Sequence, residues 1–154
     1  LLRKFGVHLV VIVRNATNDD CSQIAALGGE LHRISSLSPM DYDEAKTATS
    51  IASFIDQGQF VQVMDDGLIC GYLIGAAFPS WFGYDLIATD FAWYVSPGHK
   101  GSGALRMMRS FIKWCKAKGV KQIRPGVSTG DKRAVEIYKR LGFSTAGENL
   151  LMTL

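Results

Sequence analysis

The sequence is poor in cysteine, and its cysteines lie far apart. Only Cys21, Cys70 and Cys115 occur in 154 residues. No two of them have the short spacing of a zinc or redox motif, so the sequence predicts no metal site. Because disulfides persist mainly in oxidising compartments, we expect reduced thiols in a cytoplasmic protein.

Long apolar runs and a strong excess of one charge are also missing. The apolar run VHLVVIV, residues 7–13, has the size of one strand and falls far short of the roughly 20 residues that span a bilayer. Seventeen Lys and Arg against 14 Asp and Glu leave a net charge of +3. This mild balance is compatible with an anionic ligand but does not by itself indicate a nucleic-acid binder. We therefore expect neither a membrane nor a nucleic acid as partner.

The chain alternates strand and helix patterns, without repeats or low-complexity tracts. Strands are predicted at Val7–Val13, on both sides of the Asp-Asp-Gly turn at 65–67, at Leu86–Val95, at Val120–Val127 and in a terminal region. Helices are predicted from a Thr17–Asp20 capping box to about Ile34, and at about Asp43–Asp56, Gly103–Lys118 and Asp131–Leu141. This order predicts one α/β or α+β domain, residues 1–154.

The stretch VSPGHKGSGALRMM, residues 95–108, places glycines and Lys100 at the start of a helix. A helix N-terminus leaves its first amides without internal partners and carries about half a positive charge. Glycines let an anion approach these amides, so the stretch suits a diphosphate. A flexible strand-to-helix connection is the alternative. ATP and NAD are not favoured, because the Gly-Lys-Ser/Thr of a P-loop is missing and Arg106 stands where the dinucleotide fingerprint needs glycine.

A second stretch, GDKRAVEIYKRLGF at residues 130–143, predicts a short helix that Asp131 caps and that Gly142 ends. Its Ala134, Ile137 and Tyr138 lie near one face. A tyrosine on an inward face needs a hydrogen-bond partner for its hydroxyl. Taken alone, a tyrosine in this position is more often a core residue than a catalyst.

Together the two stretches resemble the GNAT superfamily of N-acetyltransferases. The shared motifs are a strand ending Val-x-Pro, a cation-Gly-x-Gly loop that enters a helix, and later Ala-x-x-x-Tyr-x-x-x-Gly-Phe. In detail, PSWFGYDLIATDFAWYVSPGHKGSGALRMM with GVSTG is most similar to a branch common in phage genomes. The loop departs from the family pattern in Lys100, which replaces Arg or Gln, and in Leu105, which replaces a small residue. The resemblance implies a central mixed, mostly antiparallel sheet, splayed between strands 4 and 5, with helices on both faces.

The resemblance also implies acetyl-CoA as cofactor. Its diphosphate would lie on the loop and helix start, and its pantetheine along the end of the strand before them. The implied cofactor-binding residues are Trp93, Tyr94, Val95, Lys100, Gly101, Ser102, Gly103, Ala104, Leu105, Asp131 and Ala134. Pro125 is consistent with the splay, because proline cannot donate to a strand ladder.

The same resemblance assigns the acid–base roles. Tyr138 is expected to protonate the leaving thiolate, and Asp90 to act as base on the attacking amine through a water. The aromatic loop that contains Trp81 and Phe82 is expected to border the acceptor. His99 is expected to be solvent-exposed, with a phosphate contact as the alternative.

The sequence therefore predicts an N-acetyltransferase that acts on a primary amine of a small molecule or protein, as a monomer or homodimer. One alternative is a module on the same fold that binds acyl-CoA or a host partner without turnover. Another is a toxin-type acetyltransferase acting on aminoacyl-tRNA, against which the lack of a basic stripe argues.

Overall fold

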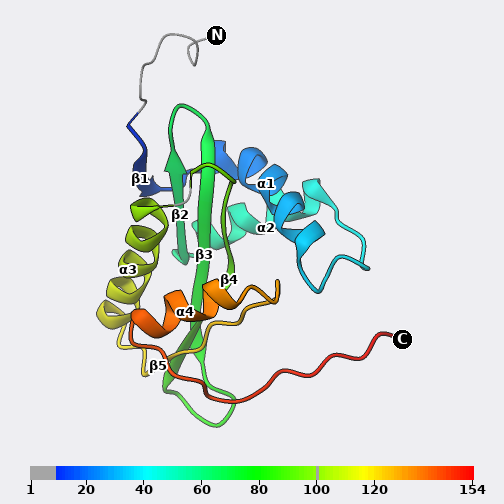
Figure 1. The fold of residues 1–154 in the computed structure, drawn as a ribbon. Coiled ribbons are helices and arrows are strands. Elements are labelled where there is room, and N and C mark those ends of the chain that lie inside the picture. The colour runs from blue at the N-terminus through cyan, green and yellow to red at the C-terminus, as the bar shows by residue number, and fades with distance from the viewer. Residues whose placement is uncertain (1–9, 100) are drawn as a thin grey trace.

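The computed structural model describes residues 10–99 and 101–154. Five strands form one sheet in the order β1-β2-β3-β4-β5 (Figure 1). The antiparallel strands are β1 (Ile12–Asn15), β2 (Phe60–Asp65), β3 (Ile69–Pro79) and β4 (Leu86–Val95). The short β5 (Gln122–Ile123) pairs with β4 in parallel. The predicted mixed, mostly antiparallel sheet is confirmed.

Helices cover both faces of the sheet, as predicted (Figure 1). One face carries α1 (Cys21–Ile34) and α2 (Glu44–Asp56), and the other carries α3 (Ser102–Ala117) and α4 (Lys132–Arg140). Local capping sets where α1, α2 and α4 begin. Asp43 accepts from the Lys46 amide and Asp131 accepts from the Arg133 amide. The capping box precedes α1 around a short 3-10 turn, η2 (Asn18–Asp20).

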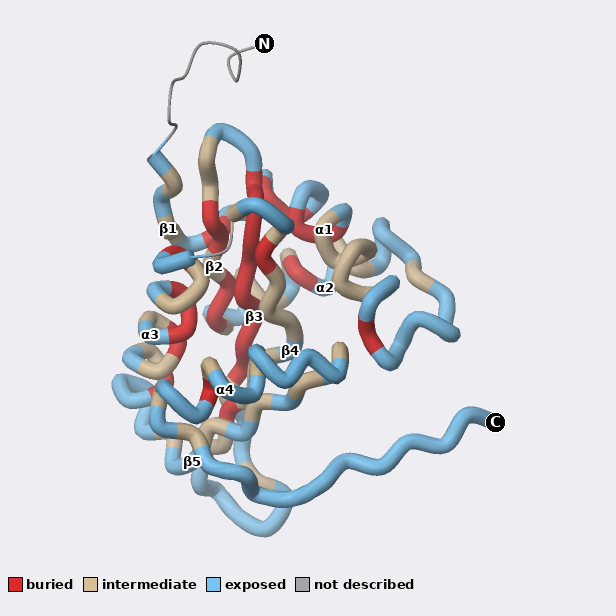
Figure 2. The backbone as a smooth tube through the Cα atoms, viewed as in Figure 1, coloured by how far each residue is buried: buried red, intermediate tan, exposed pale blue. Residues whose placement is uncertain are grey.

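The central strand β3 lies between the two halves of the core (Figure 2). Its first eight residues are buried, as expected of a strand that helices cover on both faces. The close approach of α3 needs glycine at position 75. A Cβ on Gly75 would lie 2.3 Å from Cε2 of Phe111. Packing against β3 therefore fixes the position of α3 on the sheet.

Three strand predictions differ from the structure. Residues 7–9 of the predicted first strand lie outside the described residues, and β1 begins only at Ile12. The predicted strand Val120–Val127 shrinks to the two residues of β5. The predicted terminal strand is wrong, because residues 142–154 form neither helix nor strand, and the segment 144–154 is exposed (Figure 2). Its one run of apolar residues, Leu150–Met152, is shorter than the roughly four residues that indicate a strand.

No helix of the described residues is long and apolar enough to cross a bilayer.

Candidate active site

Strand β4 has very different neighbours on its two edges. Its pairing with β3 runs from Leu86 to Val95, with a register shift that leaves Phe91 as an extra, bulged residue. Its pairing with β5 covers only two residues, and the last backbone bond between them in the described residues runs from the Arg124 amide to the Ala88 carbonyl, at 2.7 Å. The chain then reaches Pro125, which cannot donate to a ladder. The two strands diverge there, as predicted.

Tyr138 and Asp90 meet where the strands diverge. The hydroxyl of Tyr138 donates a hydrogen bond to Oδ2 of Asp90. Asp90 stands at the bulge of β4, and Tyr138 lies on the inner face of α4 with 7% of its surface exposed. Trp93 and Phe143 pack edge-on against the tyrosine ring, with centroids 5.5 Å and 5.4 Å away. The ring is therefore held in place from two sides.

Burial controls the electrostatics of this pair. Burial raises the pKa of Asp90, and hydrogen bonds from Tyr138 and from backbone amides, that of Gly126 among them, only partly oppose the rise. Burial, followed by the nearby Asp90 charge, raises the pKa of Tyr138 well above its ordinary value. Oδ1 of Asp90 is buried and has no hydrogen-bond partner among the described residues. The pair thus combines a protonated phenol with a carboxylate that retains a free acceptor.

Among the described residues, no side chain caps the backbone amides at the start of α3. The N-cap residue Gly101 offers no side chain, so the first N–H groups of the helix remain uncapped. Gly101 is exposed, and apart from its chain neighbours no atom of the described residues lies within 4 Å of the place where its Cβ would be. Just before it, Gly98 has a φ of +90°, a conformation that favours glycine. This geometry leaves room for an anion at the helix start.

Gly103 has a packing role that needs no ligand. It is buried, and a Cβ at this position would lie 2.7 Å from Cε of Met64. Substitution of Gly103 would therefore test the contact between α3 and β2 rather than the open surface at Gly101.

The comparisons with known proteins agree with this geometry. A model of the family described as "Acetyltransferase (GNAT) family" matches residues 30–143. The chain belongs to the acetyltransferase (GNAT) family. No curated protein matches this GNAT chain.

Solved structures share the GNAT fold at low sequence identity. A predicted acetyltransferase from Clostridium acetobutylicum, solved with acetyl-CoA, is 16% identical with a TM-score of 0.77, over 94% of this chain and 96% of its own. An acetyltransferase from Trypanosoma brucei is 17% identical with a TM-score of 0.73, over 94% and 100%. A ribosomal-protein-alanine N-acetyltransferase from Brucella melitensis biovar Abortus 2308 is 12% identical with a TM-score of 0.72, over 94% and 99%. At these identities the likeness establishes the fold.

The other predicted site residues of this GNAT protein are spread more widely. Lys100 lies outside the described residues. Trp81 and Phe82 lie on the loop between β3 and β4, 93% and 97% exposed, and no aromatic contact within the described residues joins them to Tyr138. Tyr94 points to the opposite face of the sheet, where its hydroxyl donates to Glu30 at 2.8 Å. The structure therefore brings together Asp90, Trp93 and Tyr138, and leaves the loop aromatics apart.

The remaining residues of the two motifs have ordinary surroundings. Val95 is buried on the α3 side of the sheet, and Ser102 is exposed. Ala104, Leu105 and Ala134 are half-buried.

The expectation that His99 is solvent-exposed is wrong. Its side chain is 21% exposed, and Nε2 lies 2.8 Å from Oδ2 of Asp66. Sequence reasoning assigned Asp66 only to a turn, and a contact across 33 residues has no local signal.

A cavity of about 940 Å³ adjoins the site of this GNAT protein without containing it. It lies between β5, α4 and the chain after α4, and Tyr138, Pro125 and Phe143 are among its lining residues. Neither Asp90 nor Trp93 lines it. Tyr138 therefore lines this cavity and bonds to a carboxylate that does not line it.

Proposed function

We propose that this protein is an acetyl-CoA-dependent N-acetyltransferase, which moves an acetyl group directly to a primary amine of a small molecule or protein. The observation that carries the proposal is the Tyr138–Asp90 hydrogen bond at the point where β4 and β5 diverge. A protonated phenol next to a buried carboxylate supplies an acid and a base within one contact.

The described residues suit acetyl-CoA at both ends of the site. The uncapped amides at the start of α3, beside the open space at Gly101, suit its diphosphate. The stretch from Trp93 to Val95 pairs with β3 on one edge and extends beyond the reach of β5 on the other. Its backbone groups on that free edge can bind the pantetheine arm. Lys100 stays a predicted phosphate contact.

Bound acetyl-CoA would supply a thioester, whose carbonyl carbon the amine attacks and whose sulfur leaves as a thiolate. The attacking amine must first lose a proton, since an ordinary lysine-like amine has a pKa of about 10.4. Asp90 takes that proton from the ammonium group, through a water. The raised pKa of Asp90 makes it a stronger base than an exposed carboxylate.

Tyr138 completes the proton balance. Its raised pKa keeps it protonated at neutral pH, so its hydroxyl can give a proton to the departing sulfur. Asp90 then returns the proton that it took from the ammonium group to the phenolate, through the hydrogen bond that already joins them. The last proton leaves the new amide nitrogen for solvent, so the whole transfer releases one proton.

The cofactor half of the proposal is tested by thermal unfolding with added acetyl-CoA, NAD or ATP. Acetyl-CoA should raise the melting temperature, because a ligand that binds only the native state stabilises it. Gly101→Val should reduce that rise, since its side chain enters the space beside the free amides. Gly83→Val is the matched control, because Gly83 is also exposed with open space at its Cβ position. A rise with NAD or ATP alone, or an equal rise in Gly101→Val, would contradict the proposal.

Release of CoA in the presence of a panel of amines tests the transfer itself. A protein that acetyl-CoA stabilises, but that releases no CoA with any amine or with water, would instead be the acyl-CoA-binding module. The acceptor role of Trp81 and Phe82, the cytoplasmic location, the similarity to a phage branch and a monomeric or homodimeric state stay predictions.

A further inference from the structure

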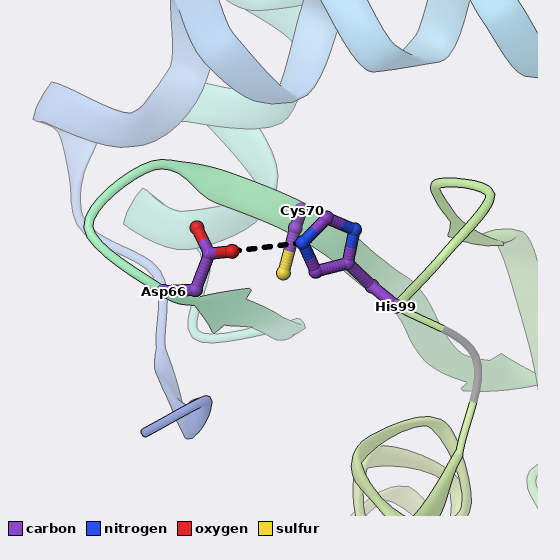
Figure 3. A group of neighbouring side chains, drawn as sticks. All are labelled: Asp66, Cys70 and His99. Atoms are coloured by element: carbon purple, nitrogen blue, oxygen red, sulfur yellow. Dashed lines mark hydrogen bonds and ion pairs between the residues drawn. The ribbon is translucent and has the colours of Figure 1, made fainter. Parts of the chain in front are cut away.

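Three side chains of different metal-binding chemistry converge beside the start of α3 (Figure 3). Asp66 comes from the β2–β3 turn, Cys70 from the start of β3 and His99 from the loop after β4. Within the described residues, their ligand atoms all lie within 4.8 Å of one another. This group is separate from Asp90 and Tyr138, which take no part in it.

The backbone holds the three residues in this arrangement. The register of β2 and β3 shifts at Asp65, whose carboxylate contacts Arg14 at 2.9 Å, while the carboxylate of Asp66 turns toward His99. The Ser96 amide donates to the Cys70 carbonyl at 2.9 Å, and the His99 amide donates to the Ser96 carbonyl at 3.1 Å. The loop that carries His99 is therefore bonded directly to the residue that carries the thiol.

We propose that Asp66, Cys70 and His99 bind a zinc ion. Imidazole nitrogen, thiolate sulfur and carboxylate oxygen are the three donor types that Zn²⁺ takes in proteins. Calcium and magnesium prefer oxygen ligands alone, so a set with sulfur and nitrogen argues against them. Zinc–ligand bonds of about 2.0–2.3 Å place tetrahedral ligand atoms about 3.3–3.8 Å apart.

Side-chain rotation has to bring the three ligand atoms to these separations. Nε2 of His99 and Oδ2 of Asp66 are 2.8 Å apart and must separate by about half an ångström or more. Cys70 is buried, whereas Asp66 and His99 are partly exposed, so a water from the solvent side can fill the fourth position.

The thiol of Cys70 must lose its proton to solvent when the ion binds. Burial raises the pKa of Cys70 to about 11, so the charge of the metal has to offset this cost. Its Sγ now makes only a weak bond to the Met64 carbonyl, at 3.5 Å. The bound ion would join the β2–β3 hairpin to the loop that leads into α3, in addition to the Asp66–His99 contact.

The experiment uses Co²⁺ in place of Zn²⁺, because a tetrahedral Co²⁺ site with a thiolate ligand absorbs visible and near-ultraviolet light. The full-length protein, first treated with a chelator, is titrated with Co²⁺ and then with Zn²⁺. We expect one equivalent of Co²⁺ to produce a thiolate charge-transfer band, and Zn²⁺ to abolish it. Cys70→Ala and His99→Ala should each lose the band, and Asp66→Asn should weaken Co²⁺ binding by about 10- to 100-fold.

Cys115→Ala is the matched control, because Cys115 is also buried, its pKa is also raised to about 11, and it lies outside the group. It should keep the band. His99→Ala removes a partly exposed side chain, so it decides the question if Cys70→Ala fails to fold. Absence of the band in the folded natural sequence, or an undiminished band in His99→Ala, would overturn the proposal and leave Asp66 and His99 as an ordinary pair.

Discussion

Two tyrosine–carboxylate pairs lie on opposite faces of the sheet. Both have the same hydrogen bond, but they differ in burial and in how completely the carboxylate is hydrogen-bonded. Tyr94 donates to Glu30 on the α1 face, and Tyr138 donates to Asp90 on the α4 face. Burial, followed by Glu30, raises the pKa of Tyr94 to about 12. Tyr94 is half-buried where β4 pairs with β3, and its partner Glu30 belongs to α1.

The Tyr138 pair is buried more deeply and less completely bonded. Its carboxylate keeps one buried oxygen without a partner among the described residues, and Asp90 stands at the bulge of β4. Burying polar groups without full hydrogen bonding costs stability, so such places often serve function. The comparison teaches that the bond alone does not indicate catalysis; the buried oxygen without a partner at the strand bulge does.

The largest expected effect is on turnover, which should depend on Tyr138 and not on Tyr94. Tyr138→Phe keeps the ring and removes the proton donor, so turnover should fall by about 10²- to 10⁴-fold. Tyr94→Phe should leave turnover nearly unchanged, because its hydroxyl faces away from the site. Release of CoA per folded molecule measures both. Equal turnover in the two variants would remove Tyr138 from the mechanism.

The second largest effect concerns the two carboxylates, Asp90 and Glu30. Only Asp90 should influence how kcat/KM depends on pH. Asp90 acts as a base only when ionised, so kcat/KM should rise with pH as Asp90 loses its proton. Because burial raises the pKa of Asp90, this rise should lie above the ordinary aspartate value of 3.8. Asp90→Asn should abolish the rise and lower kcat/KM by about 10²-fold. Glu30→Gln is the control, and an identical profile in Asp90→Asn and the natural sequence would exclude Asp90 as the base.

The smallest expected effect is on stability. Tyr138→Phe removes the side-chain donor to Oδ2 of Asp90, whose Oδ1 already lacks a partner among the described residues, and should cost about 1–3 kcal/mol of unfolding free energy. Tyr94→Phe should cost less, about 0.5–1.5 kcal/mol, because water can reach the half-buried Glu30. Urea unfolding at one pH compares them. A larger loss in Tyr94→Phe would reverse the ranking of the two pairs.

Local signals made the helices and the main hairpin predictable. The cap at Asp131 and the turn before Gly67 depend on neighbouring residues, and the structure confirms them. The motif that carries Tyr138 placed it correctly on the inner face of a short helix.

Long-range register explains what the sequence could not show. The bulge at Phe91 and the meeting of Asp66 with His99 depend on how distant strands align, for which no local pattern exists. The prediction of a terminal strand was wrong because a strand also needs a sheet edge with which to pair. The segment 144–154 pairs with none among the described residues and is exposed. Trp81 and Phe82 are also exposed, and no contact within the described residues explains why aromatic residues stand there.

The central claim, that Tyr138 and Asp90 act as one proton-transfer unit, is tested most directly by a double-mutant cycle on turnover. Residues that act as a unit are strongly non-additive. We predict that the Tyr138→Phe/Asp90→Asn double variant releases CoA about as fast as the slower single variant. If the two losses instead multiply, the residues act independently, and the account is contradicted.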